Sequence, residues 1–115
     1  EMPNILYHIS PTLNDELILQ NGLVGSTGGK KGILHPKRIY LCKDVNTLMR
    51  FVKELNYSIN SSDWTIFQIN TNSIKNIKLY IDDTVNQSFT KPMAVYIQDT
   101  NIPATSLKIY EHIKL

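Results

Sequence analysis

Short apolar runs separated by turn-forming residues predict the elements in the first part of the chain. Residues Ile5–Ile9 form an apolar run between Pro3 and Ser10–Pro11, which is typical of a short buried strand. The polar run Asn14–Glu16 offers a helix cap and first-turn acids, and Gly22 is a suitable end for that helix. The expected apolar side of the helix consists of Leu13, Leu17 and Leu19.

The next stretch combines glycines with a second strand and a second helix. Five glycines fall within Gly22–Gly32, which predicts a loop. Arg38–Cys42 is rich in apolar and aromatic residues, which favours a strand. Asp44 can cap a following helix. The apolar positions of that helix recur at helical spacing and are Val45, Leu48, Met49, Val52 and Leu55.

From Trp64 onward the pattern becomes that of strands. Apolar and β-branched residues gather in four further segments, which are Thr65–Ile69, Leu79–Ile81, Met93–Gln98 and Leu107–His112. Two early helices and several strands with long, irregular connections do not fit repeated βαβ units. The sequence therefore predicts an α+β fold.

Composition narrows the class of protein. The chain has 115 residues, of which 42% are hydrophobic and 19% charged, as expected for one globular domain, here residues 2–115, with Glu1 taken as a cloning remnant. The single cysteine, Cys42, excludes an internal disulfide and a multi-cysteine zinc cluster. No apolar run approaches the ~18 residues of a membrane span. We therefore expect a cytoplasmic protein without a membrane partner.

The formal net charge of +2 conceals a segregation of charge. Residues 30–53 hold seven of the twelve basic residues and a single acid, Asp44. These basic residues are Lys30, Lys31, Lys37, Arg38, Lys43, Arg50 and Lys53. The stretch is either a solvated basic face or a rim that attracts a small phosphate-bearing ligand.

Two side chains are candidates for binding chemistry, each with a structural alternative. His8 lies within an apolar strand, where it is either a hydrogen-bonded core residue or a group that binds a ribose hydroxyl or a phosphate. Tyr40 is either a core aromatic whose hydroxyl reaches solvent or a flat surface for a heterocycle. The glycine loop lacks the Gly-Lys-Ser/Thr of a Walker A motif. The three histidines lack metal-ligand spacing, so no metal site is expected.

The order of these features resembles the ADP-ribosyltransferase-like superfamily. Members commonly begin with a strand carrying Tyr-His-x-Ser/Thr, followed by a helix, a Gly-Leu turn and a strand with a central Tyr or His. The chain is similar in Leu6–Ser10, in Asn21–Leu23 and in Arg38–Leu41. Its later strands and Ile102–Pro103 resemble the second half of the family, so the likeness covers nearly the whole chain.

The resemblance implies a fold and a ligand. The fold would be a small split, bent, mostly antiparallel sheet with two N-terminal helices, which holds NAD or an ADP-ribose-related nucleotide in a cleft. His8 would bind the adenosine-side ribose and act in catalysis with Tyr40, which would stack on nicotinamide. Ser10 would help to hold the nicotinamide amide. The basic residues near the pyrophosphate would be Lys30, Lys31 and Arg38.

One family feature is missing. Transferases of the His-Tyr-Glu type place a glutamate at the start of a late strand, where this chain has Met93 or Ala94. RNA 2′-phosphotransferases tolerate an apolar residue there and resemble the chain in Ala94–Asp99. They carry histidine where Tyr40 stands and rely on several arginines, of which this chain has two.

Two functions follow as hypotheses. The first is an NAD-dependent ADP-ribosyltransferase-like enzyme with a protein or RNA acceptor. The second is a non-catalytic module that binds or sequesters the nucleotide, because the glutamate is missing.

Overall fold

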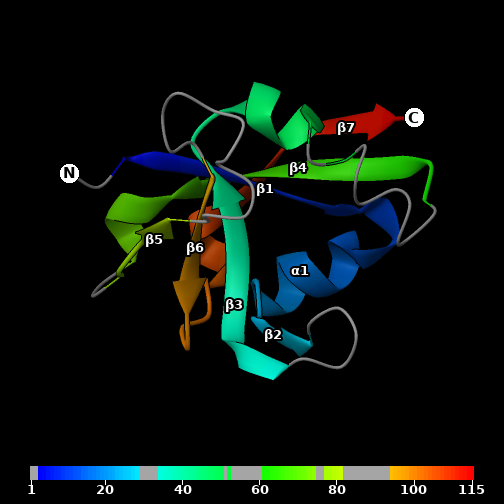
Figure 1. Ribbon diagram of the computed structural model, residues 1–115. Helices are drawn as coiled ribbons and strands as arrows, with labels where there is room; N and C mark the ends of the chain where they lie inside the picture. The colour runs from blue at the N-terminus through cyan, green and yellow to red at the C-terminus, as the bar shows by residue number, and fades with distance from the viewer. Residues whose placement is uncertain (1–2, 29–33, 51, 53–60, 75–76, 82–93) are drawn as a thin grey trace.

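The chain folds around one antiparallel sheet. The structure, a computed structural model, describes residues 3–28, 34–50, 52, 61–74, 77–81 and 94–115. Within these residues every strand pairing is antiparallel, and one main helix lies near the N-terminus, which confirms the predicted α+β class (Figure 1). Some residues that were assigned roles from the sequence lie outside the described residues, namely Lys30, Lys31, Lys53 and Met93.

Strand positions follow the predicted apolar segments closely. The strands are β1 (Ile5–Pro11), β2 (Ser26–Gly28), β3 (Leu34–Cys42), β4 (Asp63–Asn70), β5 (Tyr80–Ile81), β6 (Ala94–Gln98) and β7 (Leu107–Lys114). Six of these described strands lie in the order β5-β6-β3-β1-β4-β7, and β2 pairs with β3 outside this series. Strand β2 corrects the prediction of a continuous loop over Gly22–Gly32, because Ser26 and Gly28 pair with Arg38 and Leu34 of β3.

Helix α1 (Asp15–Asn21) confirms the predicted helix but not its apolar side. The side chain buried within α1 is Ile18, which the leucine pattern had left out. The exposed fractions of Leu13, Leu17 and Leu19 are 80%, 61% and 45%. A helix of two turns presents little more than one residue to the sheet, so the remaining apolar positions stay in solvent.

The second predicted helix is present at residues 45–50, with residue 52 also helical. Its start confirms the predicted cap, because the backbone N–H of Thr47 donates a 2.8 Å hydrogen bond to the Asp44 carboxylate. Leu48 and Val52 of this segment are buried, as their spacing predicted.

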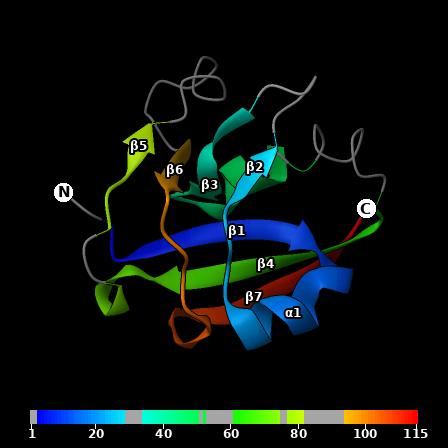
Figure 2. The same cartoon turned by 90° about the horizontal axis from the view of Figure 1, so that it is seen from below.

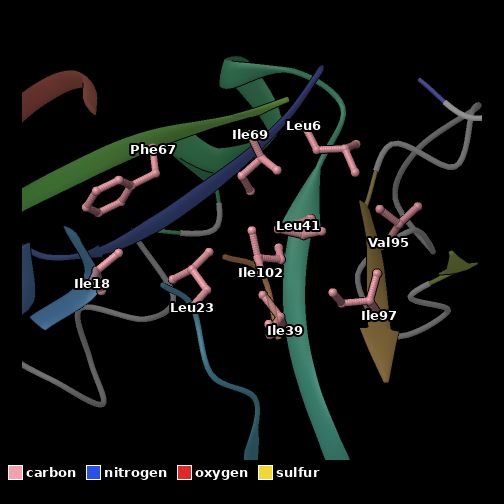
Figure 3. Packing of buried hydrophobic residues seen from close by; sticks show 10 residues of the cluster. All are labelled: Leu6, Ile18, Leu23, Ile39, Leu41, Phe67, Ile69, Val95, Ile97 and Ile102. Atoms are coloured by element: carbon pink, nitrogen blue, oxygen red, sulfur yellow. The ribbon is translucent and has the colours of Figure 1, made fainter. Parts of the chain in front are cut away.

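The core occupies both faces of the sheet. On the α1 face, Leu6, Phe67 and Ile69 of the central strands pack with Ile18 of α1, and Figure 3 shows this cluster in full. On the opposite face, side chains of β1 and β4 pack against the helical segment that starts at residue 45. Those buried residues are Ile9, Cys42, Leu48, Val52, Trp64 and Ile66.

The turn after α1 is hydrogen-bonded to the segment that follows β6. Leu23 and Ile102 exchange both backbone hydrogen bonds, at 2.9 and 3.0 Å. Gly22 precedes this bridge with φ of 80°, and a Cβ there would overlap the carbonyl oxygen of Ile102. The Gly-Leu turn and the Ile-Pro segment, which lie far apart in the sequence, therefore meet in one backbone bridge, and glycine is required for their approach.

Candidate functional site

Strand β3 changes its partner strand next to Tyr40. Residues Arg38 to Cys42 pair with β6 along one edge of β3. On the other edge, Arg38 pairs with Ser26 of β2, whereas Cys42 pairs with Tyr7 of β1. Strands β1 and β3 pair at that single position and then diverge (Figure 1). The backbone of Tyr40 therefore lies between the two partner strands.

The side chain of His8 contacts β3 where the partner strand of β3 changes. Its Nδ1 lies 2.8 Å from the backbone carbonyl oxygen of Tyr40. A carbonyl oxygen only accepts hydrogen bonds, so Nδ1 carries the proton and donates. The hydrogen bond therefore connects β1 to β3 between the position where β3 pairs with β2 and the position where it pairs with β1. The fold thus brings the His8 side chain to the backbone of Tyr40, whereas the Tyr40 side chain points to the opposite face of the sheet.

The protonation state of His8 follows from its surroundings. Burial lowers the pKa of His8 below its ordinary value of 6.5, although the hydrogen bond to the Tyr40 carbonyl acts in the opposite direction. A lowered pKa favours the neutral ring at neutral pH. In the neutral ring, a proton on Nδ1 leaves the lone pair of Nε2 as a hydrogen-bond acceptor.

Ser10 lies two residues beyond His8 in β1, and its side chain therefore points to the same face. It is 7% exposed, and its hydroxyl has no hydrogen-bond partner within the described part of the chain. Ser10 is paired across the strands with Thr65 of β4. A buried hydroxyl without a partner costs about 1–3 kcal/mol, so this group is of interest as a ligand contact.

A polar chain that sequence reasoning missed lies beside Ser10. The Thr65 hydroxyl donates to the Asp15 carboxylate at 3.0 Å, and the Thr12 and Thr65 hydroxyls are 2.9 Å apart. The Nε2 atom of His112 is 2.9 Å from the same Asp15 oxygen. Because Asp15 is in α1 and His112 is in β7, the chain joins α1 to the sheet. Each of its contacts joins residues that are 50 or more positions apart in sequence, so no local motif indicates it.

The side chain of Tyr40 lies on the other side of the sheet, with Arg38. Residues 38 and 40 alternate with the buried Ile39 and Leu41, so they share the opposite face of β3. The Arg38 guanidinium donates through Nε to the Gln98 side-chain oxygen at 3.2 Å and lies 4.5 Å from the centre of the Tyr96 ring. A longer contact of 3.5 Å joins Arg38 to the Tyr40 hydroxyl.

Two further tyrosines extend this arrangement and were not singled out from the sequence. The rings of Tyr40 and Tyr96 have centroids 5.7 Å apart, and Tyr80 stacks on Tyr96 at 5.3 Å with an interplanar angle of 13°. These residues are register partners on β3, β6 and β5. Only the strand order reveals their contact, because the sequence separates Tyr40 from Tyr96 by 56 positions.

The start of β6, where the resemblance would place a glutamate, lies close to Tyr40. Ala94 begins β6 opposite Cys42, two residues along β3 from Tyr40. The nearby Gln98 is paired with Arg38, and its amide accepts the Arg38 hydrogen bond. Glu111 is paired with Ile66 in the β4–β7 ladder, which is separated from β3 by β1. Neither residue stands where the family's glutamate would stand.

No protein-family model matches the chain, and no curated protein matches it. Among the described residues, no helix is long and apolar enough to cross a membrane. In that same part of the chain, no three His, Cys, Asp or Glu side chains come close enough together to hold a metal ion.

Proposed function

We propose that this protein binds NAD or an ADP-ribose-related nucleotide where β1 diverges from β3. The observation that carries the proposal is the hydrogen bond from His8 to the Tyr40 carbonyl. It orients a neutral imidazole at the gap between two strands and leaves Nε2 as an acceptor for a ribose hydroxyl. The order of elements along the chain supports the finer proposal of a split, bent, ADP-ribosyltransferase-like sheet.

In this proposal, different side chains contact different parts of the nucleotide. Nε2 of His8 accepts from the adenosine-side ribose, and the unpartnered Ser10 hydroxyl donates to the nicotinamide amide. The half-exposed ring of Tyr40, which lies on the face of the sheet opposite Ser10, stacks on the nicotinamide ring, so both contacts require the nicotinamide to lie in the gap where β1 and β3 diverge. Arg38, together with Lys30 and Lys31, meets the pyrophosphate.

Of binding alone and transfer of ADP-ribose, the sequence favours binding without turnover. Cleavage of the nicotinamide–ribose bond releases nicotinamide with the bonding electron pair and leaves positive charge on the ribose ring. A carboxylate normally stabilises that charge and orients a ribose hydroxyl, but the corresponding slot holds Met93 or Ala94. The protein would then hold or sequester the nucleotide.

Transfer of ADP-ribose to a protein or RNA acceptor is the second candidate. The buried Ser10 hydroxyl supports a bound nucleotide here too, because transfer would begin from the same contacts. In this reaction an acceptor oxygen or nitrogen forms the new bond to the ribose carbon as nicotinamide departs with the bonding electron pair, and the acceptor's proton passes to solvent.

Calorimetry and product analysis test the two candidates together. Titration of the protein with NAD and with ADP-ribose should show saturable binding, and incubation with NAD labelled in the nicotinamide ring should release no labelled nicotinamide. Release of nicotinamide would establish turnover and support transfer. Absence of heat with either ligand at about millimolar concentration, where the binding free energy is only about 4 kcal/mol, would refute the nucleotide site.

A further inference from the structure

Three tyrosines form a row across one face of the sheet. Tyr40, Tyr96 and Tyr80 occupy paired register positions on β3, β6 and β5, which are neighbouring strands. The residues that alternate with them on β3 and β6 are buried aliphatics of the α1-side core. The tyrosine row, defined as these three residues, therefore stands on the face opposite that core. Tyr40 is 39% exposed, and the other two rings are partly exposed.

Positive charge lies at two points along the tyrosine row. The Arg38 guanidinium is 4.5 Å from the centre of the Tyr96 ring, and the Lys78 ammonium is 5.1 Å from the centre of the Tyr80 ring. Both distances are within the range of cation–π attraction. The contacts hold the two cations against the rings while Lys78 remains exposed. A surface that alternates flat rings and cations matches a ligand that alternates bases and phosphates.

We propose that the tyrosine row, with Arg38 and Lys78, binds a short segment of single-stranded nucleic acid. Neighbouring strands are about 4.8 Å apart, so the row spans roughly 10 Å, which suits two or three nucleotides. One base stacks on the exposed ring of Tyr40 and another on the outer face of Tyr80. Lys78 moves from that face to a phosphate when the base arrives. This proposal goes beyond nucleotide binding at His8 and does not depend on it.

The geometry selects single strands over duplexes. In a duplex the base faces are stacked on one another and are out of reach of protein rings, whereas a single strand can turn its bases outward. The tyrosine row also presents few charges for its area. Duplex binding relies on many phosphate contacts, and the two cations described along the tyrosine row, Arg38 and Lys78, supply too few. Stacking would therefore contribute the larger share of the affinity.

Fluorescence anisotropy with labelled oligo-dT and oligo-rU of about fifteen nucleotides tests the proposal. The wild-type protein should bind both more tightly than it binds a duplex of the same length. Tyr80→Ala should weaken binding by about 5- to 100-fold through the lost stacking. Lys78→Gln should weaken it by a smaller factor and reduce the slope of log affinity against log salt by about 0.7. Tyr80 and Lys78 are outside the proposed NAD contacts, so neither substitution should change NAD binding.

Matched controls come from the opposite edge of the sheet. Tyr110 and Lys108 are exposed residues of β7, and the Tyr110 ring contacts Tyr7 at 5.3 Å. Tyr110→Ala and Lys108→Gln should leave oligonucleotide affinity unchanged. Tyr80→Phe keeps the ring and should bind as wild type, which separates lost stacking from a lost fold. Equal affinities of Tyr80→Ala and Tyr110→Ala, preference for duplex, or no binding at low salt would overturn the proposal.

Discussion

The Nδ1 atom of His8 donates a 2.8 Å hydrogen bond to the backbone carbonyl of Tyr40. This hydrogen bond joins the first strand to the third at the point where the partner of β3 changes from β2 to β1. Figure 2 shows β1 and β4 running side by side, and Figure 1 shows β3 running across their direction. The two residues that the sequence singles out are thus part of one local structure.

Replacing His8 should weaken nucleotide binding. His8→Ala removes the Nε2 acceptor, so we expect a loss of roughly 1–3 kcal/mol in the binding free energy of NAD or ADP-ribose, measured by calorimetry. His112→Ala is a suitable control, because that histidine belongs to the chain that joins α1 to β7. A melting curve of each variant shows whether the fold is intact. Unchanged affinity in a folded His8→Ala protein would place the ligand elsewhere.

Stability should fall as the solution becomes acidic. The pKa of His8 is lowered in the folded state by burial, and its ordinary value is 6.5. Below that value the unfolded chain binds more protons at this residue than the folded chain does, so the contribution of His8 to stability is present above pH 6.5 and is lost as the pH falls through the folded pKa.

Urea denaturation between about pH 5 and pH 8 measures this dependence. His8→Gln cannot titrate in this range and should show a flatter profile than the wild type. A wild-type protein whose stability rises as the pH falls below 6.5 would contradict the lowered pKa of His8.

Tyr40 should contribute through its ring. Tyr40→Ala removes the proposed stacking surface, and we expect a loss of about 1–3 kcal/mol in nucleotide binding free energy. Tyr40→Phe loses only the hydroxyl, whose contact with Arg38 is long at 3.5 Å, and should retain most of the affinity. Calorimetry on both variants gives the comparison. Equal losses in the two variants would assign the effect to the hydroxyl instead of the ring.

Local patterns predicted the positions of elements better than their exposure. The strand at Ile5–Ile9, the cap at Asp44 and the helix end at Gly22 depend on neighbouring residues, and the structure has all three. The apolar side of α1 was wrong because burial depends on how much of a short helix meets the sheet. Its leucines are exposed, and Ile18 alone is buried within α1.

Local sequence patterns also could not predict which residues surround the candidate site, because those contacts depend on how distant strands pair. Tyr96 and Gln98 meet Tyr40 and Arg38 only because β6 returns to β3 in one particular register. A shift of one residue would turn each of these side chains to the other face of the sheet. The contact between Asp15 and His112 likewise requires both ends of the chain to be placed. The sequence shows which residues could act, whereas strand order decides which ones meet.

The Thr65 hydroxyl should be important for stability. Thr65 is fully buried and joins Asp15 to Thr12 by hydrogen bonds. Thr65→Val has nearly the same shape but no hydroxyl, so the Asp15 carboxylate loses a donor and we expect a loss of about 1–3 kcal/mol in unfolding free energy. Thr65→Ser keeps the hydroxyl and should lose less. Urea denaturation compares them, and a valine variant as stable as the serine variant would contradict the role of the hydroxyl.

Gly22 should tolerate no side chain. Its φ of 80° and ψ of −173° lie in a region that is essentially restricted to glycine, and a Cβ would overlap the carbonyl oxygen of Ile102. Gly22→Ala must therefore disturb the backbone bridge between Leu23 and Ile102, and we expect a loss of about 3 kcal/mol or more in unfolding free energy. Gln20→Ala, at an exposed position of α1, should change it by less than about 0.5 kcal/mol. Denaturation curves followed by circular dichroism give both values. A Gly22→Ala protein as stable as the Gln20→Ala control would show that the bridge does not require glycine.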